Sequence, residues 1–180
     1  MKSYLTDKTS AFSDIEVRNP RYERITIRCT VRFREGIESG LNLKKLNFEI
    51  SNYISPWCYD NDIAIEFGAS LDLTSITGFI HSRPYVEMVT GLSAVKISMM
   101  SKNLYELSDT ARMEADQESG GVVIEPTRAW SVMVSDKQHN IELTNDSDVR
   151  EPEKAGIENL KLGDSFIIDD WVDESANLTN

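Results

Sequence analysis

Few side chains in this chain are of a type and in a spacing that could do chemistry. Its two histidines, His81 and His139, stand in no recognisable motif with a serine, a cysteine or a carboxylate that would form a nucleophile and its base. Cys29 lies in an alternating segment and Cys58 beside a tryptophan, and this spacing gives neither a zinc site nor a disulfide framework. We expect no catalytic residue, and we expect both cysteines to be reduced packing residues.

Two further patterns resemble ligand sites and fail in detail. Asp60-Asn61-Asp62 resembles the start of a calcium loop, but the third oxygen ligand, the glycine and the distal glutamate of such a loop are out of phase. Gly120-Gly121 lacks the lysine and the serine or threonine of a phosphate-binding loop. The sequence therefore predicts a capped turn at Asp60, no bound metal and no cofactor.

Aromatic and turn-forming residues gather instead between Tyr53 and Tyr85. A proline stops a helix, a tryptophan supplies a large rigid surface, and a glycine after alternating residues allows a bend. This combination predicts a docking surface, with Trp57 in the core or at an interface rather than stacked on a ligand. We also expect Trp57, Phe67 and Phe79 to be largely buried between the first helix and the sheet. The clusters are Ser55-Pro56-Trp57-Cys58-Tyr59-Asp60, Ile65-Glu66-Phe67-Gly68 and Arg83-Pro84-Tyr85-Val86.

The charge of the chain is concentrated in its second half. Residues 1–100 hold 12 basic and 12 acidic side chains, whereas residues 101–180 hold 7 and 18 and so carry the whole net charge of −11. An acidic chain does not neutralise phosphates, which argues against nucleic acid or an anionic membrane as a partner. No apolar run is long enough to span a bilayer, and the first twelve residues lack the pattern of a signal peptide.

The elements that must position these residues follow from periodicity. Residues 25–33 alternate strictly, which predicts a half-buried strand. Its outer row, which includes Arg28, Arg32 and the following Arg34, indicates a salt-bridged sheet face or a surface for an acidic partner. Apolar residues at spacings of three and four predict a helix over about 40–54, ended by Pro56.

Three more elements are expected before residue 100. Alternation predicts a strand over residues 63–67 that bends at Gly68 and continues through Leu71 and Leu73. A short helix capped by Thr74 or Ser75 must end before Pro84, and a third strand lies between Val86 and Met99.

The second half is predicted to be less regular. Residues 101–143 read as a linker followed by a β-hairpin formed by residues 130–134 and 140–143. Residues 144–180 read as an acidic extended tail that orders on a partner, and its docking residues are Phe166, Ile167, Ile168 and Trp171. The predicted class is α+β: a small mixed sheet with two packed helices over residues 24–100, preceded by an N-terminal segment of residues 1–23 and followed by the hairpin and the tail.

The order of the clusters resembles a known family. Val17-x-Asn19-Pro20-x-Tyr22-Glu23, Val31-Arg32-Phe33-Arg34-x-Gly36, Ser55-Pro56-Trp57 with Tyr59-Asp60, Ile65-x-Phe67-Gly68 and Arg83-Pro84-Tyr85-Val86 resemble the C-terminal region of baseplate J-like proteins. Those proteins are wedge components of contractile phage tails and of related extracellular contractile injection systems. The resemblance covers about residues 3–143, and it departs from the family at Ala69, where a second glycine is usual.

The resemblance implies a structural protein without an active site. It implies partners among the wedge, hub and sheath proteins of a baseplate, and synthesis in a bacterial cytoplasm before the subunit joins a phage tail-like particle. The alternative is a free-standing adaptor or regulator that binds one protein and is also not an enzyme. The residues expected to form its structural and interface motif are Asn19, Pro20, Tyr22, Ser55, Pro56, Trp57, Tyr59, Asp60, Phe67, Gly68, Arg83, Pro84 and Tyr85.

Overall fold

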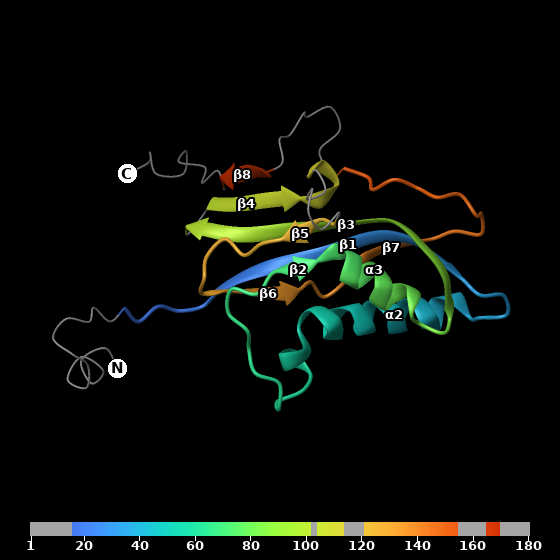
Figure 1. Ribbon diagram of the computed structural model, residues 1–180, viewed down its shortest axis with the longest axis horizontal. Coiled ribbons are helices and arrows are strands. Elements are labelled where there is room, and N and C mark those ends of the chain that lie inside the picture. Colours follow the sequence, from blue (N-terminus) through green and yellow to red (C-terminus); the bar gives the residue numbers. More distant parts are fainter. Residues whose placement is uncertain (1–15, 102–103, 114–120, 155–164, 170–180) are drawn as a thin grey trace, which may run out of the picture.

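The computed structural model describes residues 16–101, 104–113, 121–154 and 165–169 (Figure 1). Within these residues a mixed sheet carries two α-helices on one face, α2 (Ser39–Ile54) and α3 (Leu73–His81), which confirms the predicted α+β class. The strand order is β6-β1-β3-β4-β8, and β7 also pairs with β1. None of the helices in the described part is long and apolar enough to cross a membrane. The strands are β1 (Arg21–Phe33), β2 (Leu71–Asp72), β3 (Val86–Ser101), β4 (Leu104–Asp109), β5 (Val123–Ile124), β6 (Ser131–Ser135), β7 (Asn140–Leu143) and β8 (Ser165–Asp169).

Strand β1 is the centre of the sheet and contains the predicted alternating segment. Its inner side chains, from Ile25 to Val31, are buried under the helices, while the outer row is only partly covered. The Arg28 guanidinium donates to the Asp109 carboxylate at 2.5 Å, and Arg32 pairs with Glu87 at 3.1 Å. The outer row is therefore a salt-bridged sheet face, as one of the two sequence interpretations predicted.

Both predicted helices form, with one change at a cap. Helix α2 begins where the Glu38 carboxylate accepts a hydrogen bond from the Leu41 amide, and the 3₁₀ turn η1 (Pro56–Cys58) follows directly after it. Helix α3 is capped by Asp72, whose carboxylate accepts from the amides of Thr74 and Ser75. The prediction of Thr74 or Ser75 as the cap was wrong, because the aspartate that precedes the helix already satisfies both free amides.

Residues 63–67 do not form a strand, although they alternate. They lie in a loop with exposed side chains, and only Leu71 and Asp72 pair as β2, with the short strand β5. The loop runs beside β6, the edge strand of the sheet, but in the described part of the chain residues 63–67 make no ladder with it. Gly68 does mark a bend: its φ is +70°, and its amide donates to the Ser131 carbonyl at 2.8 Å.

The predicted hairpin is also wrong. Strands β6 and β7 do not pair with each other, because each runs parallel to β1, β6 along residues 21–25 and β7 along residues 28–31 (Figure 1). The short connection between them stays attached to the same edge, since the Asp136 amide donates to the Ile25 carbonyl and the Ile27 amide donates to His139. The two strands therefore form one interrupted edge strand.

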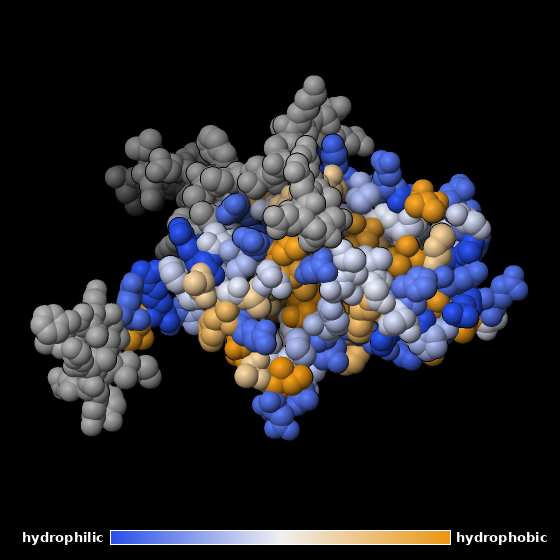
Figure 2. All heavy atoms as spheres, in the orientation of Figure 1, coloured by the Kyte–Doolittle hydropathy of each residue, from blue (hydrophilic) through white to orange (hydrophobic). Residues whose placement is uncertain are grey.

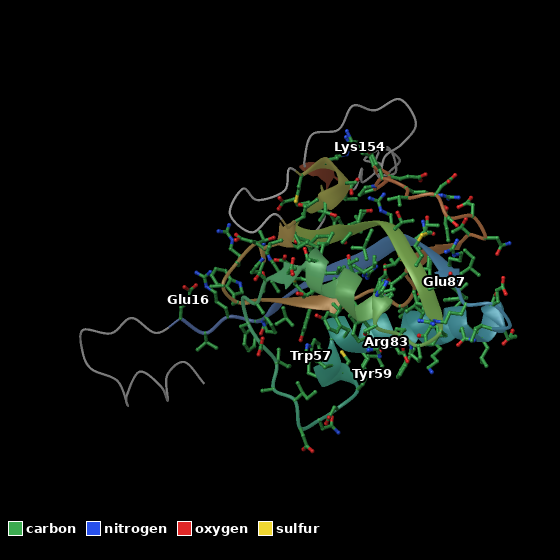
Figure 3. All side chains as sticks on the ribbon, turned by 45° about the vertical axis from the view of Figure 1, so that its right-hand side comes forward. Glu16, Trp57, Tyr59, Arg83, Glu87 and Lys154 are labelled. Carbon is green, nitrogen blue, oxygen red and sulfur yellow. The ribbon has the colours of Figure 1, made fainter. Side chains whose placement is uncertain are left out.

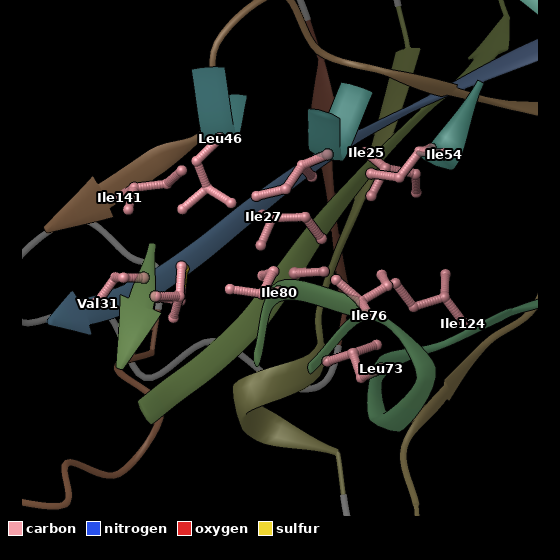
Figure 4. Packing of buried hydrophobic residues seen from close by; sticks show 14 of the residues in the cluster. Ile25, Ile27, Val31, Leu46, Ile54, Leu73, Ile76, Ile80, Ile124 and Ile141 are labelled. Atoms are coloured by element: carbon pink, nitrogen blue, oxygen red, sulfur yellow. The ribbon is translucent and has the colours of Figure 1, made fainter. Parts of the chain in front are cut away.

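The core is aliphatic, which corrects the prediction about aromatic residues. Phe67 is 56 % exposed, Trp57 is half-buried on η1, and Phe79 only packs against the margin of the core. Isoleucine and leucine side chains from the sheet and both helices fill the interior instead (Figure 4). Burying each such side chain contributes about 1.5–3 kcal/mol. The fully buried members include Ile25, Ile27, Val31, Leu46, Ile50, Ile76, Ile80, Val86, Ala94 and Ile124.

The chain after residue 101 contributes more to the sheet than predicted. Residues 104–109, expected to be linker, form β4 on the free edge of β3. After β7 the chain crosses the outer face, where Arg32 donates to Ser147 and the Thr90 hydroxyl donates to the Arg150 carbonyl. Of the predicted tail-docking residues, Phe166, Ile167 and Ile168 belong to β8, which pairs with β4. Trp171 lies outside the described residues.

Candidate docking surface

The outward face of α2 carries large apolar side chains that the core does not use. Leu46, Ile50 and Ile54 point to the sheet, whereas Phe48 lies on the opposite side of the helix and is 55 % exposed. Tyr59, which is 51 % exposed just after η1, packs edge-on against Phe48 with 5.1 Å between the ring centroids. Figure 3 labels Trp57 on η1 and Tyr59 directly after it. An exposed aromatic pair next to a rigid helix is typical of an interface anchor.

The apolar area continues into the loop that follows η1. Orange and tan side chains gather over this loop at the lower edge of the face seen in Figure 2. We use the term α2–η1 surface for its exposed or half-exposed apolar members. They are Leu41, Phe48, Trp57, Tyr59, Ile63, Ile65 and Phe67.

Charges of both signs lie beside this surface, because the loop of residues 60–66 carries three exposed carboxylates. Lys44 and Lys45 are both exposed on α2, in the otherwise acidic chain. The Lys45 ammonium lies 3.9 Å from the Glu49 carboxylate and 5.0 Å from the centre of the Tyr85 ring, so it is held in place on one flank of the helix. Apolar rings with lysines on one side and carboxylates on the other fit a partner that presents apolar side chains among charges of both signs.

The Arg83-Pro84-Tyr85 motif is mainly structural. Tyr85 is buried, and its hydroxyl donates to the Glu49 carboxylate at 2.5 Å, which ties the start of β3 to α2. Burial, and then the hydrogen bond to Glu49, raises the pKa of Tyr85. Arg83 stacks on Phe79 at 4.3 Å and donates to its carbonyl, at the C-terminal end of α3, where a cation is favourable (Figure 3).

The other predicted motif residues fall into two groups, one around η1 and the loop after it and one at the start of β1. Ser55 is buried, and its hydroxyl accepts a hydrogen bond from the Ser135 amide, while Pro56 starts η1 and Gly68 makes the bend. The Asp60 carboxylate accepts from the Asp62 amide, which confirms the capped turn. Asn19, Pro20 and Tyr22 are exposed at the start of β1, and they are not part of the α2–η1 surface.

A buried polar cluster around His139 joins α2 to the interrupted edge strand. The His139 Nδ1 accepts the Ile27 amide hydrogen at 3.1 Å, so in the neutral ring Nε2 carries the proton. Nε2 lies 3.3 Å from the Ser51 hydroxyl and 3.2 Å from the Ser135 hydroxyl. A nitrogen that already holds a proton cannot take one from serine, so this arrangement is not a nucleophile and its base. Burial lowers the pKa of His139 to about 4, although Asp136 acts in the opposite direction.

A second buried polar cluster crosses from β1 to β3. Glu23 is fully buried. Its carboxylate accepts a hydrogen bond from the Thr127 amide at 2.9 Å and lies 3.5 Å from the Lys96 ammonium. Burial alone would raise the pKa of Glu23. The hydrogen bonds from Ser131 and Thr127 and the charge of Lys96 outweigh this effect, so the pKa lies below its ordinary value. Across the described residues, no group of three or more histidines, cysteines or carboxylates could hold a metal ion. Burial also raises the pKa of the Cys29 thiol to about 12, which makes it unreactive.

Sequence reasoning missed two features of this site. Phe48 could have been found, because it lies off the apolar stripe of its own helix and therefore faces solvent. The contacts of His139 with Asn47 and Ser51 could not, because those residues are about 90 positions away in the sequence and no local pattern joins them.

A folded body with a broad exposed apolar surface and buried polar clusters that serve the fold has the character of a subunit of an assembly. Residues 1–120 match the family described as baseplate protein PVC11-like, and the chain belongs to this family. The match supports a structural baseplate role in a phage tail-like contractile injection system. A comparison with curated proteins gave no match.

Proposed function

We propose that this protein is a non-enzymatic wedge component of a contractile baseplate. In this role it holds neighbouring subunits together by contact and helps to link the central hub to the sheath. It would be made in a bacterial cytoplasm and then become part of the assembled particle. The family match supports the baseplate role, and the resemblance of the sequence motifs to baseplate J-like proteins supports the wedge position.

The observation that carries the proposal is the Phe48–Tyr59 pair. Two aromatic rings that are each about half exposed leave considerable apolar area in water, and burying it against a partner is favourable by roughly 25 cal/mol per Å². The few residues that each contribute about 2 kcal/mol or more to an interface are enriched in such aromatic anchors. We therefore assign subunit docking to the α2–η1 surface.

Incorporation into particles tests the assignment. In a strain that produces the particles, the chain is replaced by Phe48→Ser with Tyr59→Ser, and its copy number per particle is measured by quantitative mass spectrometry. Val149→Ser is the control, because Val149 is an apolar residue outside the surface and is more exposed than either ring. We expect incorporation to fall at least tenfold in the double variant and to stay normal in the control. Normal incorporation of the double variant would contradict the assignment.

The same experiment distinguishes a wedge component from a free-standing adaptor. An adaptor that is not a particle component would be absent from purified particles even as the wild-type chain. A wedge component would be present at a fixed copy number, and its deletion would leave assembly incomplete.

A further inference from the structure

The outer face of the sheet, opposite the helices, carries a groove at one end. It has a volume of about 820 Å³ and runs across β4, β3, β1 and β6. The register places its residues on one face, since Tyr105 pairs with Met99 and both Ile97 and Val134 pair with Arg24. Tyr22 is 55 % and Met99 is 48 % exposed. The lining is completed by residues 135–137.

The opposite end of the same face is already covered by the chain itself. Arg32 donates to the Asp146 carbonyl and to the Ser147 hydroxyl, at 3.1 and 2.5 Å. Thr90 both donates to the Arg150 carbonyl and accepts the Arg150 amide hydrogen. The segment after β7 thus returns across the outer face before β8 adds to the edge of β4.

We propose that residues 170–180 of the same molecule occupy the groove. Strand β8 ends at Asp169, opposite Leu104, and Leu104 pairs with Ser101, so the segment begins at the end of the sheet where Met99 and Tyr105 lie. Crossing from β8 to β6 requires four strand spacings, about 19 Å. Eleven extended residues reach roughly 36 Å, which is more than enough.

The chemistry of the segment fits that of the groove. Its sequence places Trp171 and Val172 among Asp170, Asp173 and Glu174. The groove offers apolar side chains with Arg24 and Lys137 beside them. Its one carboxylate, on Asp136, accepts from the Thr26 hydroxyl at 2.9 Å and from the Lys137 amide at 2.7 Å, so it is directed to groups of its own chain. The segment therefore offers apolar side chains with carboxylates, and the groove offers apolar side chains with cations.

Attachment in the same molecule favours this occupant over another copy. A segment joined directly to the edge of the sheet has an effective concentration in the millimolar range, far above that of a free subunit. The sequence predicted that the acidic tail orders on a partner, which would have to offer apolar side chains and cations. The groove supplies that chemistry within the chain itself.

Photo-crosslinking of the full-length chain tests the proposal. Benzoylphenylalanine replaces Met99 in the groove and, in a control protein, Phe48 on the α2–η1 surface. Mass spectrometry of the monomer band identifies the linked peptide. We expect Met99→benzoylphenylalanine to link to residues 170–180 and the Phe48 control not to. Adding Arg24→Glu and Lys137→Glu should lower the yield at least fivefold while the melting temperature stays within 2 °C.

Two outcomes would overturn the proposal. Cross-links from position 99 to residues 170–180 only in the dimer band would assign the groove to a second copy. Cross-links that never involve residues 170–180 would leave the groove to another protein. Placing the photoreactive residue at Tyr22 instead of Met99 repeats the test if the first substitution disturbs the fold.

Discussion

His139 replaces a backbone carbonyl in the β-ladder, because its ring accepts the Ile27 amide hydrogen between the two strands of the interrupted edge. This requires a neutral ring. The folded-state pKa of about 4 lies below the ordinary 6.5, so the unfolded chain takes up a proton first as the pH falls. The stability that depends on His139 is therefore complete above pH 6.5 and is lost between about pH 6.5 and 4. The loss is on the order of 3 kcal/mol.

Urea unfolding at several pH values checks this prediction. The free energy of unfolding of the wild-type chain should fall across this range, whereas that of His139→Gln should be lower at pH 7.5 and vary less. His81→Gln is the control, since His81 is exposed. Equal pH slopes for wild type and His139→Gln would show that the ring is not the group that titrates.

Two glycines give a matched pair with opposite expected effects. Gly68 has a φ of +70°, and an added Cβ would lie 3.0 Å from the Ala129 carbonyl oxygen. Gly78 lies within α3 with open space around it. Thermal unfolding should show that Gly68→Ala destabilises the chain by roughly 1–3 kcal/mol. Gly78→Ala should stabilise it by up to about 1 kcal/mol, because alanine is the better helix former. A neutral Gly68→Ala would mean that the bend relaxes freely.

At the scale of elements, periodicity predicted what local sequence can determine. The first strand and the first helix were expected from their apolar spacing, the short helix and the third strand were also expected, and all four are present. The predictions of a strand over residues 63–67 and of the hairpin were wrong, because alternation shows that a segment could be a strand but neither whether it pairs nor with which strand. The edge of β1 accepts β6 and β7 in parallel, and the partners are more than 100 residues apart.

The N-cap of α3 is Asp72 in the structure, whereas the sequence predicted Thr74 or Ser75, and mutation can tell these apart. Asp72 accepts two amide hydrogens of the first turn, so Asp72→Ala should cost about 1 kcal/mol. Thr74→Ala, at the position first expected to cap, should be close to neutral. Urea unfolding of the two variants measures both values, and a larger loss for Thr74→Ala would favour the sequence-based cap.

At the scale of the whole molecule, the segment after β7 connects the end of the chain to the body. The contacts of Arg32 and Thr90 with residues 146–150 predict that a chain ending at Leu143 is less stable than one ending at Lys154, by roughly 1–3 kcal/mol for a few lost hydrogen bonds. Differential scanning calorimetry of the two truncated chains gives the comparison. Equal stabilities would support the sequence expectation of an independent tail from residue 144.

Hydroxyl-radical footprinting of assembled particles tests whether the α2–η1 surface docks on other baseplate proteins. Oxidation rates of individual side chains report their exposure to solvent, and they are compared between the isolated chain and the chain within particles. We predict that Phe48 and Tyr59, about half exposed in the isolated chain, become protected at least fivefold on assembly, while the highly exposed Val149 keeps its rate. Unchanged rates for both rings in assembled particles would show that the α2–η1 surface is not the docking surface.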